Sequence, residues 1–185
     1  KISKLYDHLF TLFPFEGKFF SKYGLESTFI GNPIVENILE IDRQMIEKKI
    51  NLNNEKKILL FLPGSRENEL NRMLPIYTKT SIEILKKFNF IKIIYMVPEE
   101  FLNKIESYIS PISELNNKDT LIISSKYKND IFRNSYFAIA TSGTITLELA
   151  ISKIPSIVCY KMSQLTYIVL KRLVKIKWIS LPNII

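Results

Sequence analysis

Residues 58–66 organise the rest of the chain. They read Ile58-Leu59-Leu60-Phe61-Leu62-Pro63-Gly64-Ser65-Arg66. Five consecutive apolar residues predict a buried strand, and a glycine directly after the strand lets the backbone turn tightly and approach a ligand. Apolar residues at helical spacing follow, at positions 70, 74, 77, 82 and 85. Together these features predict the first β–α unit of a parallel sheet.

The same alternation continues toward the C-terminus. β-Branched and apolar runs predict strands at 91–97, 121–123, 136–140 and 155–160. Helices are expected at 99–109, at 128–134, from about 144 and at 164–175. Five consecutive β–α units predict an α/β fold, a Rossmann-like doubly wound parallel sheet that begins near residue 55.

The first 50 residues follow a different pattern. Strand-like runs at 9–13 and 28–30 flank a short helix, and 42–50 has a helical pattern. We expect residues 1–35 to be the tail of a preceding N-terminal domain and 36–54 a linker with a helix. Residues 55–185 would form the Rossmann-like domain. The chain begins without Met and stops in mid-pattern, so we expect a fragment that is incomplete at its C-terminus.

Composition narrows the class of protein only partly. The 185 residues carry a formal net charge of +8 and are 46% hydrophobic, as in globular proteins. The basic excess is compatible with nucleic acid, anionic membrane or phosphorylated substrates, and equally with biased genome composition. The single cysteine, Cys159, is expected to be a buried strand thiol in a reducing compartment. His8 has no partner for a metal site, and no apolar run is long enough to span a bilayer.

The first candidate site is the turn after the first strand. Gly64 permits close approach, Ser65 and the backbone N–H groups at the helix start can receive a phosphate oxygen, and Arg66 can grip a diphosphate with two donors. The turn is not a Walker motif. Taken alone, it is also compatible with an ordinary turn that carries an exposed arginine.

The second candidate site follows the fourth strand of this sheet, where small residues surround a glycine: Ser142, Gly143 and Thr144. Ser142 and Thr144 are each expected as helix N-caps, and the helix amides suit an anion. Glu148, in the first turns of that helix, can accept hydrogen bonds from both hydroxyls of a ribose. The alternative is that Thr144 and Glu148 only stabilise a helix start.

Both candidates lie at carboxyl ends of strands in one predicted sheet, where ligands bind in open α/β folds. A nucleoside diphosphate needs hydrogen-bond donors for its phosphates and an acceptor for its ribose hydroxyls. The two candidate sites supply these groups together. The segment 95–98 either walls a base pocket or is a core strand. The basic helix expected at 164–175 is compatible with an anionic membrane surface or with simple packing.

Several motifs resemble the lipid-A-disaccharide synthase family in their order along the chain. They are Phe13-Pro14-Phe15-Glu16, Phe29-Ile30-Gly31-Asn32-Pro33, Leu62-Pro63-Gly64-Ser65-Arg66-Glu67-Asn68-Glu69, Thr141-Ser142-Gly143-Thr144 with Leu147-Glu148, Lys171-Arg172-Leu173-Val174-Lys175, and Leu181-Pro182-Asn183. The similarity extends over nearly the whole chain. It implies the C-terminal domain of a two-domain B-type glycosyltransferase.

The resemblance also implies a reaction and partners. The family transfers 2,3-diacylglucosamine from UDP to lipid X, which is 2,3-diacylglucosamine 1-phosphate, with inversion, and neither a metal nor another cofactor is expected. Ser65 and Arg66 would bind the diphosphate, Glu148 the ribose, and Asn183 would line the active site near the sugar. Peripheral association with the cytoplasmic face of a Gram-negative inner membrane and a possible homodimer of the full-length protein are further implications.

Two features depart from the family pattern. Asn32 stands where the family commonly has His, so a role for that imidazole does not carry over. The acidic general base proposed in the family belongs to the N-terminal domain, so this chain alone is expected to be inactive. Two other classes remain open: another UDP-sugar enzyme such as a UDP-GlcNAc 2-epimerase, and a basic module that binds nucleic acid, against which the dispersed lysines argue.

Overall fold

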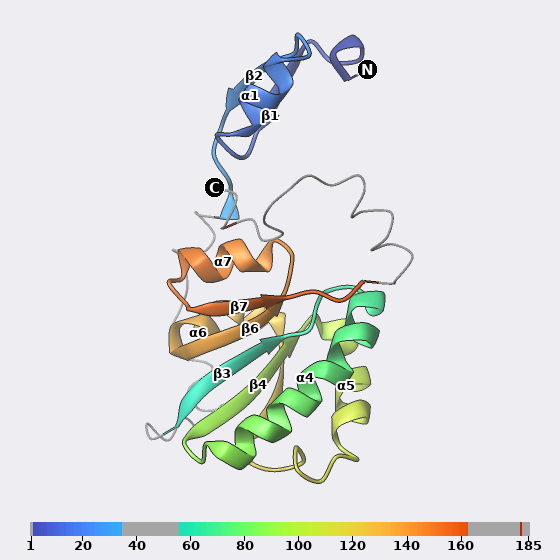
Figure 1. The fold of residues 1–185 in the computed structure, drawn as a ribbon, viewed down its shortest axis with the longest axis vertical. Helices are drawn as coiled ribbons and strands as arrows, with labels where there is room; N and C mark the ends of the chain where they lie inside the picture. Colours follow the sequence, from blue (N-terminus) through green and yellow to red (C-terminus); the bar gives the residue numbers. More distant parts are fainter. Residues whose placement is uncertain (1, 35–55, 163–181, 183–185) are drawn as a thin grey trace.

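The computed structural model describes residues 2–34, 56–162 and 182. Residues 56–162 form a five-stranded sheet with helices on both faces, and residues 2–34 form a small separate unit (Figure 1). The helices expected at 42–50 and 164–175 lie outside the described residues. The proposed domain boundaries stay predictions.

The sheet is parallel throughout and runs in the order β5-β4-β3-β6-β7. The chain begins at the central strand, moves outward through two strands, and returns to the other side of the centre. The expected strands are present, with these bounds: β3 Lys57–Leu62, β4 Ile91–Val97, β5 Thr120–Ser124, β6 Ser135–Thr141 and β7 Ser156–Cys159. The order therefore reverses between β3 and β6, which creates a topological switch point.

The helices divide between the two faces of the sheet. Figure 1 shows α4 (Glu67–Lys87) and α5 (Leu102–Ile109) on one side, and α6 (Lys128–Asn134) and α7 (Ile145–Ile151) on the other. Short 3₁₀ turns, η2 (Glu99–Phe101) and η3 (Ser125–Tyr127), precede α5 and α6. This arrangement confirms the doubly wound α/β fold.

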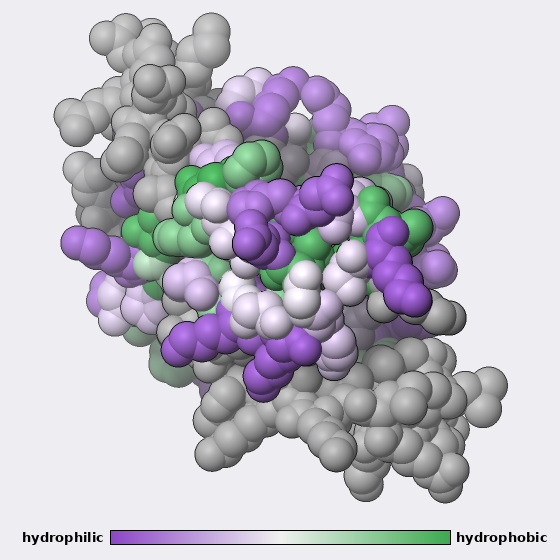
Figure 2. All heavy atoms as spheres, turned by 90° about the horizontal axis from the view of Figure 1, so that it is seen from above, coloured by the Kyte–Doolittle hydropathy of each residue, from purple (hydrophilic) through white to green (hydrophobic). Residues whose placement is uncertain are grey.

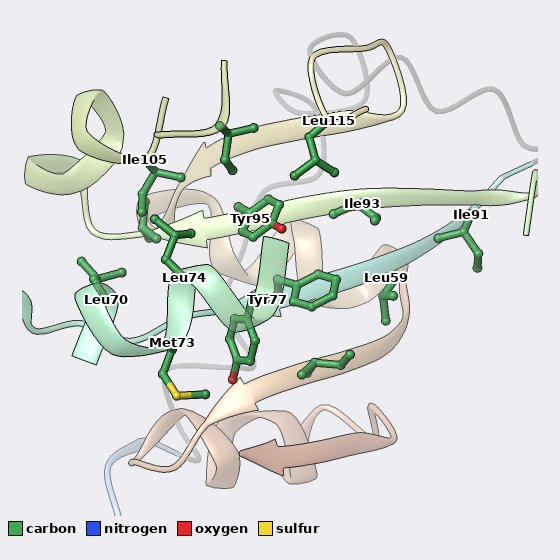
Figure 3. Packing of buried hydrophobic residues seen from close by; sticks show 14 residues of the cluster. Leu59, Leu70, Met73, Leu74, Tyr77, Ile91, Ile93, Tyr95, Ile105 and Leu115 are labelled. Carbon is green, nitrogen blue, oxygen red and sulfur yellow. The ribbon is translucent and has the colours of Figure 1, made fainter. Parts of the chain in front are cut away.

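Two apolar clusters hold the layers together, because successive side chains of a strand point to opposite faces. Leu59 and Phe61 pack toward α4 and α5, whereas Ile58 and Leu60 pack toward α6 and α7. On the α4 side, buried residues of the helix interlock with β3 and β4 (Figure 3). Beside this cluster, the hydroxyls of two buried residues pair with each other, Ser81 Oγ with Tyr95 Oη at 2.6 Å. Tyr95 is therefore a core residue.

The N-terminal unit comprises η1 (Ile2–Lys4), β1 (His8–Thr11), α1 (Glu16–Ser21) and β2 (Glu26–Phe29), with the two strands parallel. Its surface is unusually apolar, since Leu5 is 76% exposed and Phe10 67% exposed. The view from above shows hydrophobic residues at the surface between hydrophilic ones (Figure 2). Among the described residues, no helix has the length and apolar character needed to cross a membrane.

The sequence predicted that the thiol of Cys159 is buried, but this cysteine is only half-buried. Its strand, β7, lies at the edge of the sheet, and the preceding Ser156 and Ile157 are exposed. The remaining burial still raises the pKa of the Cys159 thiol. A raised pKa keeps the thiol protonated at neutral pH and fits a structural role.

Candidate functional site

The two predicted candidate segments meet at the switch point of the sheet. Leu62, the last residue of β3, is in register with Ala140 of β6, and Thr141 ends β6 one residue later. The turns that follow both strands therefore leave the same edge of the sheet. Tyr77 of α4 links this edge to the core, because its hydroxyl pairs with Thr141 Oγ1 at 3.2 Å.

The turn after β3 depends on Gly64, whose φ is +122°, a backbone conformation that L side chains rarely adopt. Arg66 is the N-cap residue of α4 and has extended backbone angles. Glu69, three residues into the helix, reaches back: Ser65 N–H donates to its Oε2 at 3.3 Å, and Arg66 Nη1 donates to its Oε1 at 2.9 Å. An acidic residue at this position stabilises the free amides of a helix start.

The turn after β6 differs from the expectation. Thr144 occupies the N-cap position of α7, but its backbone is helical and its side chain makes no capping bond. Thr146 makes a different contact with this turn, because its Oγ1 donates to the carbonyl of Gly143 at 2.7 Å. The prediction that Thr144 caps the helix through its side chain is therefore wrong, although the helix starts where expected.

Glu148 on α7 is a buried carboxylate, only 8% exposed. Lys128 Nζ, at the start of α6, lies 2.7 Å from Glu148 Oε2. The contact is an ion pair by distance, yet Oε2 receives no hydrogen bond of good geometry among the described residues. A buried carboxylate is costly without a counter-charge, and the nearby ammonium of Lys128 offsets part of that cost.

A cavity of about 700 Å³ joins these segments. Its walls come from the ends of β3, β4, β5 and β6 and from the helix starts that follow them. Seven predicted residues line it together: Gly64, Ser65, Arg66, Ser142, Gly143, Thr144 and Glu148. Met96 and Pro98 also line it, so the segment 95–98 contributes to both wall and core. The eighth predicted residue, Asn183, lies outside the described residues.

Sequence reasoning missed the contribution of the turn after β5, which brings Ser124, Lys126 and Lys128 to the cavity. The signal was the same as at the other two strand ends: a strand followed by small hydroxyl residues and a helix. Glu99 pairs with Lys126 at 2.5 Å, and this hydrogen bond raises the pKa of the lysine. Lys126 therefore remains a cation at neutral pH.

A second hollow of about 350 Å³ lies at the opposite end of the sheet, near the start of β4. Its charged groups are already used in structure, because Lys56 Nζ pairs with Asp119 Oδ2 at 2.7 Å. It has no glycine turn or helix start directed into it from a strand end. Within residues 2–34 and 56–162, no cluster of histidine, cysteine and acidic residues is suited to hold a metal ion.

The fold and the cavity define a Rossmann-like α/β unit with a cavity at its switch point. Solved structures share this fold. A UDP co-structure of MnaA from S. aureus superimposes with a TM-score of 0.68 at 18% identity, covering 99% of this chain and 51% of that one. A UDP-GlcNAc 2-epimerase from Methanocaldococcus jannaschii in complex with UDP-GlcNAc and UDP gives 0.61 at 20% identity, covering 82% and 45%.

Sequence comparison identifies the family within this class. The lipid-A-disaccharide synthetase family model matches residues 1–185, so the chain belongs to that family. Lipid-A-disaccharide synthases of Rickettsia canadensis and Colwellia psychrerythraea are 35% and 31% identical to it over its whole length. The chain spans 47% of the length of each of these relatives.

Proposed function

We propose that this chain supplies the nucleotide-binding half of a glycosyltransferase that uses a UDP-sugar in lipid A synthesis. One observation carries the proposal: the turn after β3 and the buried carboxylate of Glu148 line the same cavity at the switch point. Membership of the lipid-A-disaccharide synthetase family supports the choice of reaction. The expected donor and acceptor are UDP-2,3-diacylglucosamine and 2,3-diacylglucosamine 1-phosphate.

The diphosphate end of the nucleotide is assigned to the turn after β3. Sugar transfer breaks the bond to UDP, so negative charge grows on the diphosphate in the transition state. The Ser65 N–H, the start of the 21-residue helix α4 and the 80% exposed Arg66 side chain would stabilise that charge once the Glu69 carboxylate, which pairs with Ser65 and Arg66, moves aside. Donors fixed in place before the reaction lower its barrier without needing a metal.

The ribose end is assigned to Glu148. A carboxylate can accept hydrogen bonds from two adjacent hydroxyls, and the contact with Lys128 holds this one in position beside the cavity. Lys128 is 34% exposed in its side chain, so it lies at the boundary between the buried carboxylate and the solvent. This placement gives Lys128 a positioning role in the proposal.

Other parts of the proposal concern the whole protein. The general base, the acceptor site and any dimer contact are assigned outside the described residues. The same holds for the basic segment with Lys171 and Arg172, which we propose to contact the anionic cytoplasmic face of the inner membrane. The enzyme class favoured here is a transferase rather than an epimerase, because identity to lipid-A-disaccharide synthases is 31–35%, against 18–20% for the UDP-sugar enzymes that share the fold.

Nucleotide binding provides the test of this proposal. UDP should raise the melting temperature of the purified protein and bind at least about tenfold tighter than 2′-deoxy-UDP, the size expected for a lost hydrogen bond to a charged group. Glu148→Gln should remove most of that discrimination, as measured by calorimetric titration. Glu106→Gln, an exposed change on α5 away from the cavity, serves as the control.

Two results would contradict the proposal. A folded wild-type protein with no UDP-dependent stabilisation, but with salt-sensitive binding to unrelated duplex DNA, would favour a basic binding module. Product analysis of the whole protein tests the reaction itself. A disaccharide phosphate and UDP are expected, whereas a free or epimerised sugar would indicate an epimerase.

A further inference from the structure

Among the residues that the structure describes, three cationic side chains line the cavity, and each is paired with a carboxylate. Arg66 pairs with Glu69, Lys126 with Glu99, and Lys128 with Glu148, at 2.9, 2.5 and 2.7 Å. A fourth carboxylate, Glu100, also lines the cavity, so the acidic side chains of its described lining outnumber the cationic ones. An incoming anion must either share these cations or replace a carboxylate.

Glu69 differs from the other two carboxylates in what it occupies. Its Oε2 accepts the Ser65 N–H and its Oε1 accepts from Arg66 Nη1, and these are the two donors assigned to the diphosphate. The Glu69 side chain is only 15% exposed and lies against the turn. A Cβ placed on Gly64 would be 2.8 Å from Glu69 Oε2, so the carboxylate occupies the space that a side chain at position 64 would need.

We propose that Glu69 is the residue that sets anion affinity at this site: its carboxylate occupies the position of a diphosphate oxygen and is displaced when a ligand binds. This inference rests on the proposed function, because it takes the diphosphate position from it. The carboxylate accepts from Ser65 N–H and Arg66, and these hydrogen bonds keep the turn ordered. The same carboxylate weakens the binding of every anion that uses these donors.

The physical reason is repulsion between like charges at short range. A diphosphate oxygen that reached Ser65 N–H and Arg66 would lie within a few ångströms of Glu69 if the side chain stayed in place. Near a protein surface such a contact is several times stronger than in bulk water. The side chain therefore has to rotate away from the grip, and the free energy of that rotation weakens binding.

The test compares three ligands with the wild-type protein and with Glu69→Gln. The glutamine keeps the length of the side chain and an oxygen that can accept the Ser65 N–H, but it removes the charge. UDP and inorganic pyrophosphate should each bind roughly five- to tenfold tighter to Glu69→Gln, the effect of one screened charge at close range. Uridine, which lacks the diphosphate, should bind equally to both proteins.

Glu67→Gln is the matched control. Glu67 lies on the same helical turn, but its carboxylate pairs with Lys104 at 2.7 Å, and it does not line the cavity. Removing its charge changes the net charge of the protein by the same amount and should alter UDP affinity less than about twofold. Melting temperatures of all three proteins, measured without ligand, show that each is folded.

The outcomes separate this inference from the proposed function. Unchanged or weaker pyrophosphate binding in folded Glu69→Gln would overturn the role given to Glu69. A parallel change in uridine binding would overturn it too, because the effect would then not be specific to the diphosphate. The wild-type protein could also bind pyrophosphate while it binds neither uridine nor UDP more tightly than pyrophosphate. The nucleotide assignment would then fail, but the pyrophosphate affinities of wild type and Glu69→Gln would still test the role of Glu69.

Discussion

Replacing Arg66 with alanine should lower the turnover of the whole enzyme by on the order of 10²-fold or more, the effect of removing one preorganised transition-state donor. The guanidinium projects from the turn after β3 into the cavity and is 80% exposed, so it contributes little to folding. The loss should therefore appear in turnover, with almost no change in melting temperature.

Two further variants sharpen this prediction. Arg72→Ala removes an exposed arginine of the same helix that does not line the cavity, and it should leave turnover within about twofold. Arg66→Lys keeps the charge but loses the planar pair of donors, so only partial activity is expected. Near-normal turnover in Arg66→Ala would contradict the assignment of the diphosphate to this turn.

Gly64→Ala should destabilise the fold by roughly 2–4 kcal/mol, because two costs add. The backbone φ of +122° is strained for any residue with a Cβ. The new methyl group would also lie 2.7 Å from Glu69 Cβ and 2.8 Å from its Oε2, so the helix start or the turn must shift. The same shift would move Ser65 and Arg66. The affinity for UDP should therefore decrease together with the free energy of unfolding.

Gly143→Ala is the control for Gly64→Ala. Gly143 lies at the other strand end of the same cavity, has no left-handed φ, and has open space where its Cβ would be. Alanine there should change the free energy of unfolding by about 0.5 kcal/mol or less. Chemical denaturation of both variants measures the difference, and equal stabilities would refute the strain assigned to the Gly64 turn.

The repeating part of the fold was accessible from sequence because its signals are local. The run 58–62 and the helical spacing after it predicted β3 and α4 closely, and α6 has the bounds expected from its pattern. The convergence of the two glycine turns also followed from sequence, since all strands of a parallel sheet end at the same edge. These predictions needed only periodicity and topology.

The ion pairs of the cavity were not accessible in the same way. Lys128 and Glu148 are distant in sequence and meet because α6 and α7 cover the same face of the sheet. The strand order determines which helices are neighbours, and no local sequence pattern indicates that order. Cys159 shows the converse: its apolar neighbours suggested burial, but β7 is an edge strand and leaves the thiol half-exposed.

UDP is expected to bind in the cavity at the carboxyl ends of β3 and β6. A crystal structure of the protein with UDP tests it most directly. We expect diphosphate oxygens within hydrogen-bond distance of Ser65 N and the Arg66 guanidinium, ribose hydroxyls on Glu148, and the Glu69 carboxylate turned away from Ser65 and Arg66. UDP bound elsewhere, or bound with Glu69 still accepting the Ser65 N–H, would refute this binding site.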